Sequence, residues 1–180
     1  PDAHAICIRN NGNANAEFKL KLNGFFPATI DEITDSIKKL PDHDGMRDEC
    51  IKAWYFVTSN TVPSSPLSGD EWYHSAGLIL NSTGFGLCDD RAIILAYLWK
   101  QMGYQARVWG LNGHVVPEVN NNGRWEMYDP NFGVFFKDEE GKIAGVEKIA
   151  ADPDILSRYT VIDSAHALLF RIRKAHLQKI

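Results

Sequence analysis

The chain has few cysteines and no pattern that would bind a metal through them. Only three of its 180 residues are cysteine, and none forms a CxxC pair, which argues against a zinc ribbon. The histidines show no metal-ligand spacing either, and the sequence has neither a glycine-rich phosphate loop nor an EF-hand loop. We therefore expect the protein to need no metal and no cofactor.

Long apolar runs and clusters of basic residues are also missing. No apolar stretch reaches the roughly 18 residues of a transmembrane helix, so no membrane span is expected. The formal net charge is −4 and Lys and Arg form no stripe, which makes nucleic acid an unsuitable partner. The 44% hydrophobic and 23% charged content is typical of a globular protein, and the length suits one domain with a proper core.

The ends of the chain leave its compartment open. The sequence begins at Pro1 rather than Met, so we interpret it as a mature form or a piece of a longer protein with additional domains. An exported or cell-surface location and a cytoplasmic one both remain open. Cys7 and Cys50 would be able to pair in an exported protein, but two buried free thiols is the interpretation we favour.

The most informative stretch begins at a cysteine that opens a helical pattern. Gly84 and Gly86 lie just upstream and allow a tight bend, and Gly103 is placed to end the helix. The apolar residues after Cys88 recur at helical spacing: Ile93, Ile94, Tyr97, Leu98 and Met102. Cys88 therefore lies in the first turn, where unpaired N–H groups and the helix dipole favour a thiolate.

After the helical pattern, the spacing of the apolar residues becomes that of strands, which predicts a hairpin. Three strands are expected, at residues 106–110, 114–119 and 124–129. Asn120–Gly123 is strong turn chemistry between the second and third of them. This pairing brings His114 and Asp129 to the open ends of neighbouring strands, about 5 Å apart. A helix-borne Cys with a His and an Asp side by side is the arrangement that nucleophilic catalysis requires.

Four motifs in this segment resemble the core of the transglutaminase-like superfamily, relatives of the papain-type cysteine peptidases. The matching residues are Gly86-Leu87-Cys88, Gly103-Tyr104-Gln105-Ala106-Arg107-Val108, Gly113-His114 and Trp125-Glu126-Met127-Tyr128-Asp129-Pro130. The resemblance implies that Cys88 is the nucleophile, His114 its base and Asp129 the acid that orients the base. It also implies an α+β fold, in which N-terminal helices and the nucleophile helix pack on an antiparallel sheet.

Two positions depart from the family pattern. Pro117 lies inside the strand of His114 and removes a backbone donor, which suggests an edge position or a bulge. Asn131 stands where relatives commonly carry a hydroxyl residue, which concerns the surroundings of the triad rather than the triad itself.

The rest of the chain is expected to be built around this core. We predict a β-hairpin lead-in within residues 1–28, followed by one domain over 29–180. Two helices are predicted at residues 29–40, with Thr29 as N-cap, and at about 44–57, where Trp54 and Tyr55 read as core. Residues 58–70 read as a loop, 133–136 and 142–146 as a second hairpin, and 153–178 as helical.

A thiol enzyme also needs donors for the oxyanion. The backbone N–H of Cys88 is the first candidate, and the second is sought among Trp72, Tyr73 and Asn81, with Trp109 as a further substrate-contact candidate. Burial of the tryptophan and helix capping by Asn81 are the simpler roles for these residues. His74 is the one rival base near Cys88 in sequence, and we interpret it as structural.

These features predict a thiol enzyme that acts on a protein, peptide or other amide-containing substrate. The acyl group would pass to water, as in a peptidase or amidase, or to an amine, as in a protein-glutamine acyltransferase; by resemblance to compact bacterial-type members we favour hydrolysis. Two alternatives stay open. One is a binding or scaffold module that keeps the fold without turnover, favoured by the aromatic residues Trp72, Tyr73, Phe85, Trp109 and Trp125. The other is an acyltransferase of the arylamine type.

Overall fold

The protein has an α+β architecture, seen in a computed structural model that describes residues 9–14, 29–42, 48–65 and 74–162. The helical segments are α1 (Ile30–Lys38), α2 (Glu49–Asn60), α3 (Ala76–Leu78), η2 (Ile79–Thr83), α4 (Cys88–Gln101), α5 (Val146–Ala151) and η3 (Pro153–Ser157). The strands are β1 (Val62–Pro63), β2 (Phe85–Gly86), β3 (Gln105–Leu111), β4 (His114–Asn121), β5 (Arg124–Asp129), β6 (Val134–Phe136) and β7 (Tyr159–Val161).

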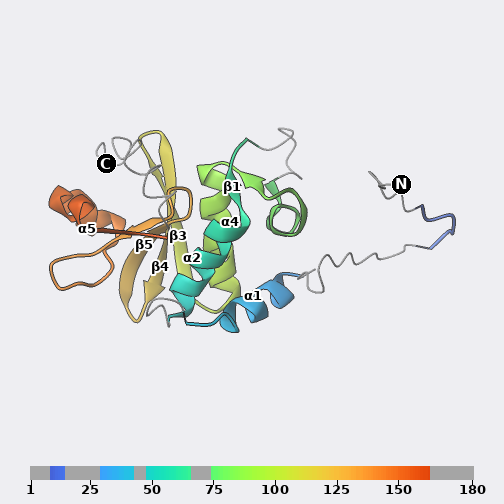
Figure 1. The fold of residues 1–180 in the computed structure, drawn as a ribbon, viewed down its shortest axis with the longest axis horizontal. Helices are drawn as coiled ribbons and strands as arrows, with labels where there is room; N and C mark the ends of the chain where they lie inside the picture. Colours follow the sequence, from blue (N-terminus) through green and yellow to red (C-terminus); the bar gives the residue numbers. More distant parts are fainter. Residues whose placement is uncertain (1–8, 15–28, 43–47, 66–73, 163–180) are drawn as a thin grey trace.

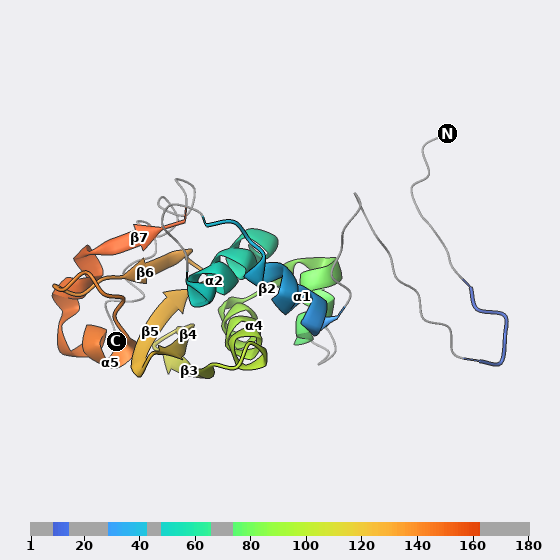
Figure 2. The same cartoon turned by 90° about the horizontal axis from the view of Figure 1, so that it is seen from below.

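The main sheet has five strands in the order β3-β4-β5-β6-β7, and every neighbouring pair is antiparallel. Helices α2 and α4 lie side by side on one side of β3, β4 and β5, and α5 lies on the other (Figure 1). In the perpendicular view β7 and β6 follow β5 at the sheet edge away from α4 (Figure 2). The short strands β1 and β2 form a separate parallel pair that leads into α4.

Two hydrophobic clusters stabilise this arrangement. The first fills the space between α1, α2, α4 and the sheet, and its largest fully buried side chains include Trp54, Trp99 and Tyr128. The second lies on the α5 side of the sheet and includes Val116, Met127 and Phe136. Burial of Trp54 agrees with its predicted core role, and Tyr55 packs partly buried against the same cluster. The sheet is therefore covered on both faces.

The first predicted helix is confirmed, and the second begins later than predicted. Thr29 caps α1 through a capping box with Glu32, and the helix ends at Lys38. Helix α2 runs from Glu49 to Asn60, with Asp48 as its N-cap through a 2.7 Å bond from the Cys50 N–H to the Asp48 carboxylate. The helix extends three residues past the expected end at Val57, and in this last turn the Thr58 hydroxyl donates to the main-chain oxygen of Trp54 at 2.8 Å.

The predicted start of the nucleophile helix is confirmed, but its apolar stripe was partly misassigned. Cys88 is the first residue of α4, and Gly103 follows the helix with a φ of 94°. Ile94 and Leu98 are buried as expected, whereas Ile93 is 56% and Tyr97 39% exposed. The buried face is completed instead by residues that the spacing did not single out: Ala92, Leu95, Ala96 and Trp99.

The hairpin at Asn120–Gly123 is confirmed. Strand β4 ends at Asn121, Asn122 and Gly123 have φ values of 53° and 84°, and β5 begins at Arg124. The edge position expected for Pro117 is wrong, since β4 lies between β3 and β5. The recorded pairing of β4 with β5 begins at Glu118, so Pro117 lies just outside this ladder and its missing N–H does not interrupt it.

The C-terminal predictions needed the largest corrections. Residues 142–146 form no strand beyond a single bridge between Lys137 and Ile143, and α5 begins at Val146. Of the helical stretch predicted over 153–178, Pro153–Ser157 is helical as a short 3-10 helix, but the prediction is wrong at Tyr159–Val161, which is strand β7, paired with β6. The aromatic and β-branched residues of β7 suit a strand, and β6 supplies the partner.

Several expectations lie outside the described residues. These are most of the N-terminal hairpin, Cys7, the last part of the loop predicted over residues 58–70, and the final stretch of the predicted C-terminal helix. In the ranges that the structure describes, no helix combines the length and the apolar character that crossing a bilayer requires.

Candidate active site

Cys88 is presented by a tightly organised helix start. It is the first residue of α4, and Asp90 in the same turn accepts the N–H of Leu87 at 3.0 Å. Gly86 is required at its position because a Cβ there would come within 2.9 Å of the Asp90 Cβ. The turn before it uses Gly84 at a φ of 66°. Cys88 is partly exposed and forms no disulfide.

His114 and Asp129 are hydrogen-bonded inside the sheet. His114 opens β4, Asp129 closes β5, and His114 Nε2 lies 2.7 Å from Asp129 Oδ2. Both side chains are buried, with 3% and 0% of their surface exposed. The predicted contact between the two strand ends is therefore present. Since Nε2 is held by the carboxylate, Nδ1 is the ring nitrogen that remains for a proton exchange with another group.

Asp129 is itself fixed from several directions. Its Oδ1 accepts the backbone N–H groups of Asn131 at 2.8 Å and Phe132 at 3.0 Å, and its main-chain oxygen accepts the indole N–H of Trp54 at 3.0 Å. Phe132 stacks on the His114 ring, with ring centroids 4.6 Å apart and planes inclined by 28°. The imidazole of His114 is therefore held at Nε2 by Asp129 and packed on its ring face by Phe132.

Cys88 and His114 line the same small hollow. Its volume is about 140 Å³, and the other lining residues are Pro63, Leu87, Gly113, Asn131 and Phe132. No hydrogen bond links Cys88 to His114 among the contacts recorded for these two described residues. Hydrogen bonds between catalytic groups are often loose in unliganded proteins and tighten when substrate binds, so shared access to one hollow is the relevant observation.

Asn131, the second departure from the family pattern, belongs to this wall. It is 8% exposed, donates its N–H to Asp129, and accepts the Arg91 guanidinium on its main-chain oxygen at 3.3 Å. Its recorded contacts use the backbone, which any residue type supplies. The substitution at this position is therefore compatible with the bonds that Asp129 receives.

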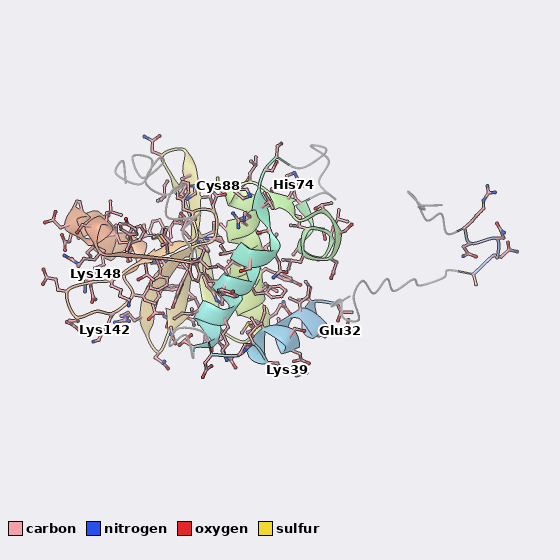
Figure 3. All side chains as sticks on the ribbon, viewed as in Figure 1. Glu32, Lys39, His74, Cys88, Lys142 and Lys148 are labelled. Atoms are coloured by element: carbon pink, nitrogen blue, oxygen red, sulfur yellow. The ribbon has the colours of Figure 1, made fainter. Side chains whose placement is uncertain are left out.

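A second His–Asp pair lies at the same end of α4. His74 and Cys88 are both labelled there in Figure 3. His74 Nδ1 lies 2.5 Å from Asp90 Oδ1, and this hydrogen bond, followed by the charge of Asp90, raises the pKa of His74. The His74 side chain is 40% exposed and His74 does not line the hollow of Cys88. This arrangement agrees with the structural role expected for His74.

The candidates for a second oxyanion donor have separate locations. Trp72 and Tyr73 lie outside the described residues. Asn81 lies within η2, and neither Asn81 nor Trp109 lines the hollow of Cys88. The Trp109 indole N–H donates to Glu118 Oε2 at 2.6 Å, so this donor is already occupied. The backbone N–H of Cys88, at the free start of α4, remains the candidate that the described geometry favours.

Trp109 belongs to a buried ion cluster instead. Glu118 is fully buried and also binds Arg107 Nε at 2.7 Å and the backbone N–H of Val146. The Arg107 guanidinium lies over the rings of Trp109, at 4.9 Å, and Trp125, at 4.2 Å. Two of the aromatic residues that favoured a binding module are thus engaged in packing around a charge pair.

Sequence reasoning missed two residues at the site, Phe132 and Arg91. Phe132 follows Asp129 by three residues, and an aromatic residue so close to a candidate acid is a usable signal. Arg91 is completely buried although it lies in α4, three residues after Cys88. A charged residue within an otherwise apolar helix face was the available sign.

Cys50 lies apart from the hollow of Cys88. Cys50 is buried as a free thiol, and burial, followed by the charge of Asp48, raises its pKa well above the ordinary value. Over the residues that the structure describes, no cluster of three His, Cys, Asp or Glu side chains could hold a metal ion. A larger hollow of about 360 Å³, with Trp54, Glu126 and Tyr128 among its lining residues, contains neither Cys88 nor His114.

Comparison of the chain with family models, with curated proteins and with solved structures found no match. The family resemblance therefore rests on the four motifs of residues 86–130 and on their order.

Proposed function

We propose that the protein is a thiol-dependent acyl-transfer enzyme with a transglutaminase-like core, which hydrolyses amide or peptide-type bonds through Cys88, His114 and Asp129. The observation that carries the proposal is that His114, bonded to the buried Asp129, and the N-terminal cysteine of α4 line one hollow. These groups are contributed by three elements, β4, β5 and α4, and only the fold brings them together.

The chemistry follows from the roles that the geometry allows. His114 Nδ1 takes the Cys88 thiol proton, and the thiolate attacks the carbonyl carbon of the amide. Asp129, bonded to Nε2, orients the ring and stabilises the imidazolium. As the C–N bond breaks, His114 returns the proton to the leaving amine and the acyl group remains on Cys88 as a thioester. Water, deprotonated by His114, then cleaves the C–S bond and releases the carboxylic acid.

The residues that line the hollow favour certain acyl groups of the substrate. Among the described lining residues, the His114 ring and the Cys88 thiol are the only ionisable groups, and Pro63, Leu87 and Phe132 supply apolar walls. An ionised side chain would lose hydration there without gaining a partner. The acyl group is therefore expected to be small and uncharged.

The first test is the pH dependence of Cys88 alkylation by iodoacetamide, followed by intact mass. A thiolate–imidazolium pair labels rapidly well below the free-thiol pKa of about 8.5. We expect this from the wild type, and we expect His114→Ala to lose about tenfold or more of the rate at pH 6.5. Cys88→Ser gives the background from the other thiols, and His74→Ala is the matched control for loss of a histidine at the same end of α4.

The outcomes separate the two function classes. Slow labelling of both wild type and His114→Ala, rising only with ionisation of a free thiol, would remove the enzyme proposal and leave the binding module. Rapid, His114-dependent labelling supports the enzyme and justifies a screen of N-acylated amino-acid anilides with uncharged and charged side chains. Release of the aniline from the uncharged members is the expected result of that screen.

A further inference from the structure

Arg91 is a buried cation within hydrogen-bonding reach of the candidate site. It lies in the first turns of α4 and its exposed fraction is 0%. Its guanidinium makes four recorded hydrogen bonds to oxygens of three residues: Nε to Thr61 Oγ1 at 2.8 Å, NH2 to the main-chain oxygens of Thr58 at 3.3 Å and Thr61 at 3.2 Å, and NH1 to that of Asn131 at 3.3 Å.

These bonds join the end of α2, which lies outside the site, to two elements that carry site residues. Thr58 and Thr61 lie at the C-terminal end of α2, Arg91 lies on the helix of Cys88, and Asn131 follows the strand of Asp129. Asn131 in turn donates its backbone N–H to Asp129 Oδ1 at 2.8 Å. The guanidinium is thus linked to His114 through a continuous series of contacts, from Asn131 to Asp129 and from Asp129 to the imidazole.

Packing alone does not explain why a charged side chain occupies the buried position of Arg91. All four recorded acceptors are uncharged oxygens, and among the described residues no carboxylate bonds directly to the guanidinium. Burial lowers the pKa of Arg91 to about 10, and the negative charge of Asp129 opposes this shift. A buried cation held by neutral groups is unfavourable compared with an apolar side chain of the same size. The negative charge of Asp129 is the charge that the buried guanidinium offsets.

We propose that Arg91 is a positioning residue of the Cys88–His114–Asp129 site: its guanidinium holds the Asp129–Asn131 turn against the nucleophile helix and balances the Asp129 charge. This inference rests on the proposed function, since it concerns the same reaction. The groups facing Arg91 are Thr58 and Thr61 at the end of α2, Asn131 and Asp129 from β5 and its following turn, and Gly86 of β2, where an added Cβ would lie 3.5 Å from Arg91 Cγ. Arg91 does not touch substrate in this account.

The expected consequence is a change in when Cys88 becomes reactive. Removal of the positive charge disfavours the neighbouring thiolate, and loosening of the turn weakens the hold of Asp129 on His114. Both effects move the rise of the alkylation rate to higher pH. A purely structural Arg91, which merely joins α2 to α4, would lower the stability of the protein and leave the pH profile in place.

The experiment measures iodoacetamide labelling of Cys88 against pH in four full-length proteins: wild type, Arg91→Met, Arg91→Lys and Thr61→Val. Thr61→Val is the matched control because it removes one acceptor at the α2 end and keeps the guanidinium and its bond to Asn131. We expect Arg91→Met to shift the profile upward by about one pH unit, which is about tenfold in rate at pH 6.5. Arg91→Lys, which keeps the charge, should recover part of this loss, and Thr61→Val should follow the wild type. Thermal unfolding of each variant records the structural effect separately.

The outcomes distinguish this inference from the proposed function. A wild type that labels as an ordinary free thiol ends both. A wild type that labels rapidly, with Arg91→Met and Thr61→Val giving equal profiles, keeps the enzyme and overturns the role of Arg91. If Arg91→Met does not fold, Arg91→Lys decides: it cannot reproduce the fork geometry of arginine, so a profile identical to that of Thr61→Val overturns the inference and an upward shift supports it.

Discussion

The two His–Asp pairs near Cys88 have the same chemical groups and different surroundings. In the pair of the sheet, His114 and Asp129 are almost completely buried and their bond is 2.7 Å long. In the pair at the start of α4, Asp90 is 4% exposed but His74 is 40% exposed. Only His114 lines the hollow that contains Cys88.

The carboxylates also differ in what their second oxygen holds. Asp129 Oδ1 accepts two N–H groups of the turn that carries Phe132, and Phe132 packs on the imidazole, so the turn and the base are fixed together. Asp90 Oδ2 accepts the N–H of Leu87, so this pair fixes the entry to α4. One pair therefore fixes the imidazole of His114, and the other fixes the peptide segment that leads into Cys88.

The largest expected effect is a difference between substitutions of the two carboxylates, Asp129 and Asp90. Asp129→Asn and Asp90→Asn each replace the acid of a His–Asp pair by its amide. Since the orienting acid fixes the tautomer of the base, we expect Asp129→Asn to lower the rate of Cys88 alkylation at pH 6.5 by about 100-fold. Asp90→Asn should lower it by less than about threefold, because the amide oxygen of asparagine can still accept the Leu87 N–H at the start of α4.

Intact-mass labelling measures both variants, with thermal unfolding as the check on folding. Equal losses would mean that the two pairs act on the thiol to the same extent. No loss in either would mean that Asp129 does not act through His114, and that the two His–Asp pairs do not differ in their effect on Cys88.

A substitution at Gly86, two residues before Cys88, tests how tightly Asp90 packs at the start of α4. In Gly86→Ala the new methyl group would lie 2.9 Å from the Asp90 Cβ, so the first turn of α4 has to shift. We expect a loss of about 1–3 kcal/mol in the free energy of unfolding, the usual range for overpacking. Urea denaturation measures it. Gly110→Ala, where an added Cβ meets nothing within 4 Å, is the matched control, and equal stabilities of the two variants would contradict the close packing of Asp90.

Sequence reasoning succeeded where the structural signal is local. Asn122-Gly123 specifies the turn, and the turn sets the antiparallel pairing of β4 and β5 from Glu118–Met127 to Asn121–Arg124. His114 and Asp129 lie beyond these pairs, at the open ends of the two strands, where their side chains bond. Sequence reasoning failed where the decisive partner is distant. Strand β7 exists because β6 pairs with it, and the spacing within residues 153–178 contains no information about that pairing.

The same limit applies within α4. Ile93 and Ile94 are adjacent and both fit an apolar stripe, and the packing against α2 and the sheet decides that Ile94 is buried. The burial of Arg91 depends on oxygens of α2 and of the turn after β5, 30 to 40 residues away in sequence. Local pattern therefore located the candidate residues Cys88, His114 and Asp129, whereas the residues that hold them in place required the fold.

The smallest expected effect concerns the pH dependence of the His74 pair. The hydrogen bond to Asp90 raises the pKa of His74, so protonated His74 stabilises the folded state. This contribution is fully present below the unfolded pKa of about 6.5 and is lost as the pH rises through the raised folded value. We expect the urea midpoint of His74→Gln to lie below that of the wild type at pH 5.5 and to match it at pH 9. In an Asp90→Asn background, the same His74→Gln change should have little effect at either pH, because the raising carboxylate is gone. A gap of equal size at both pH values would show that His74 contributes through packing rather than charge, and the start of α4 would then be held by Asp90 alone.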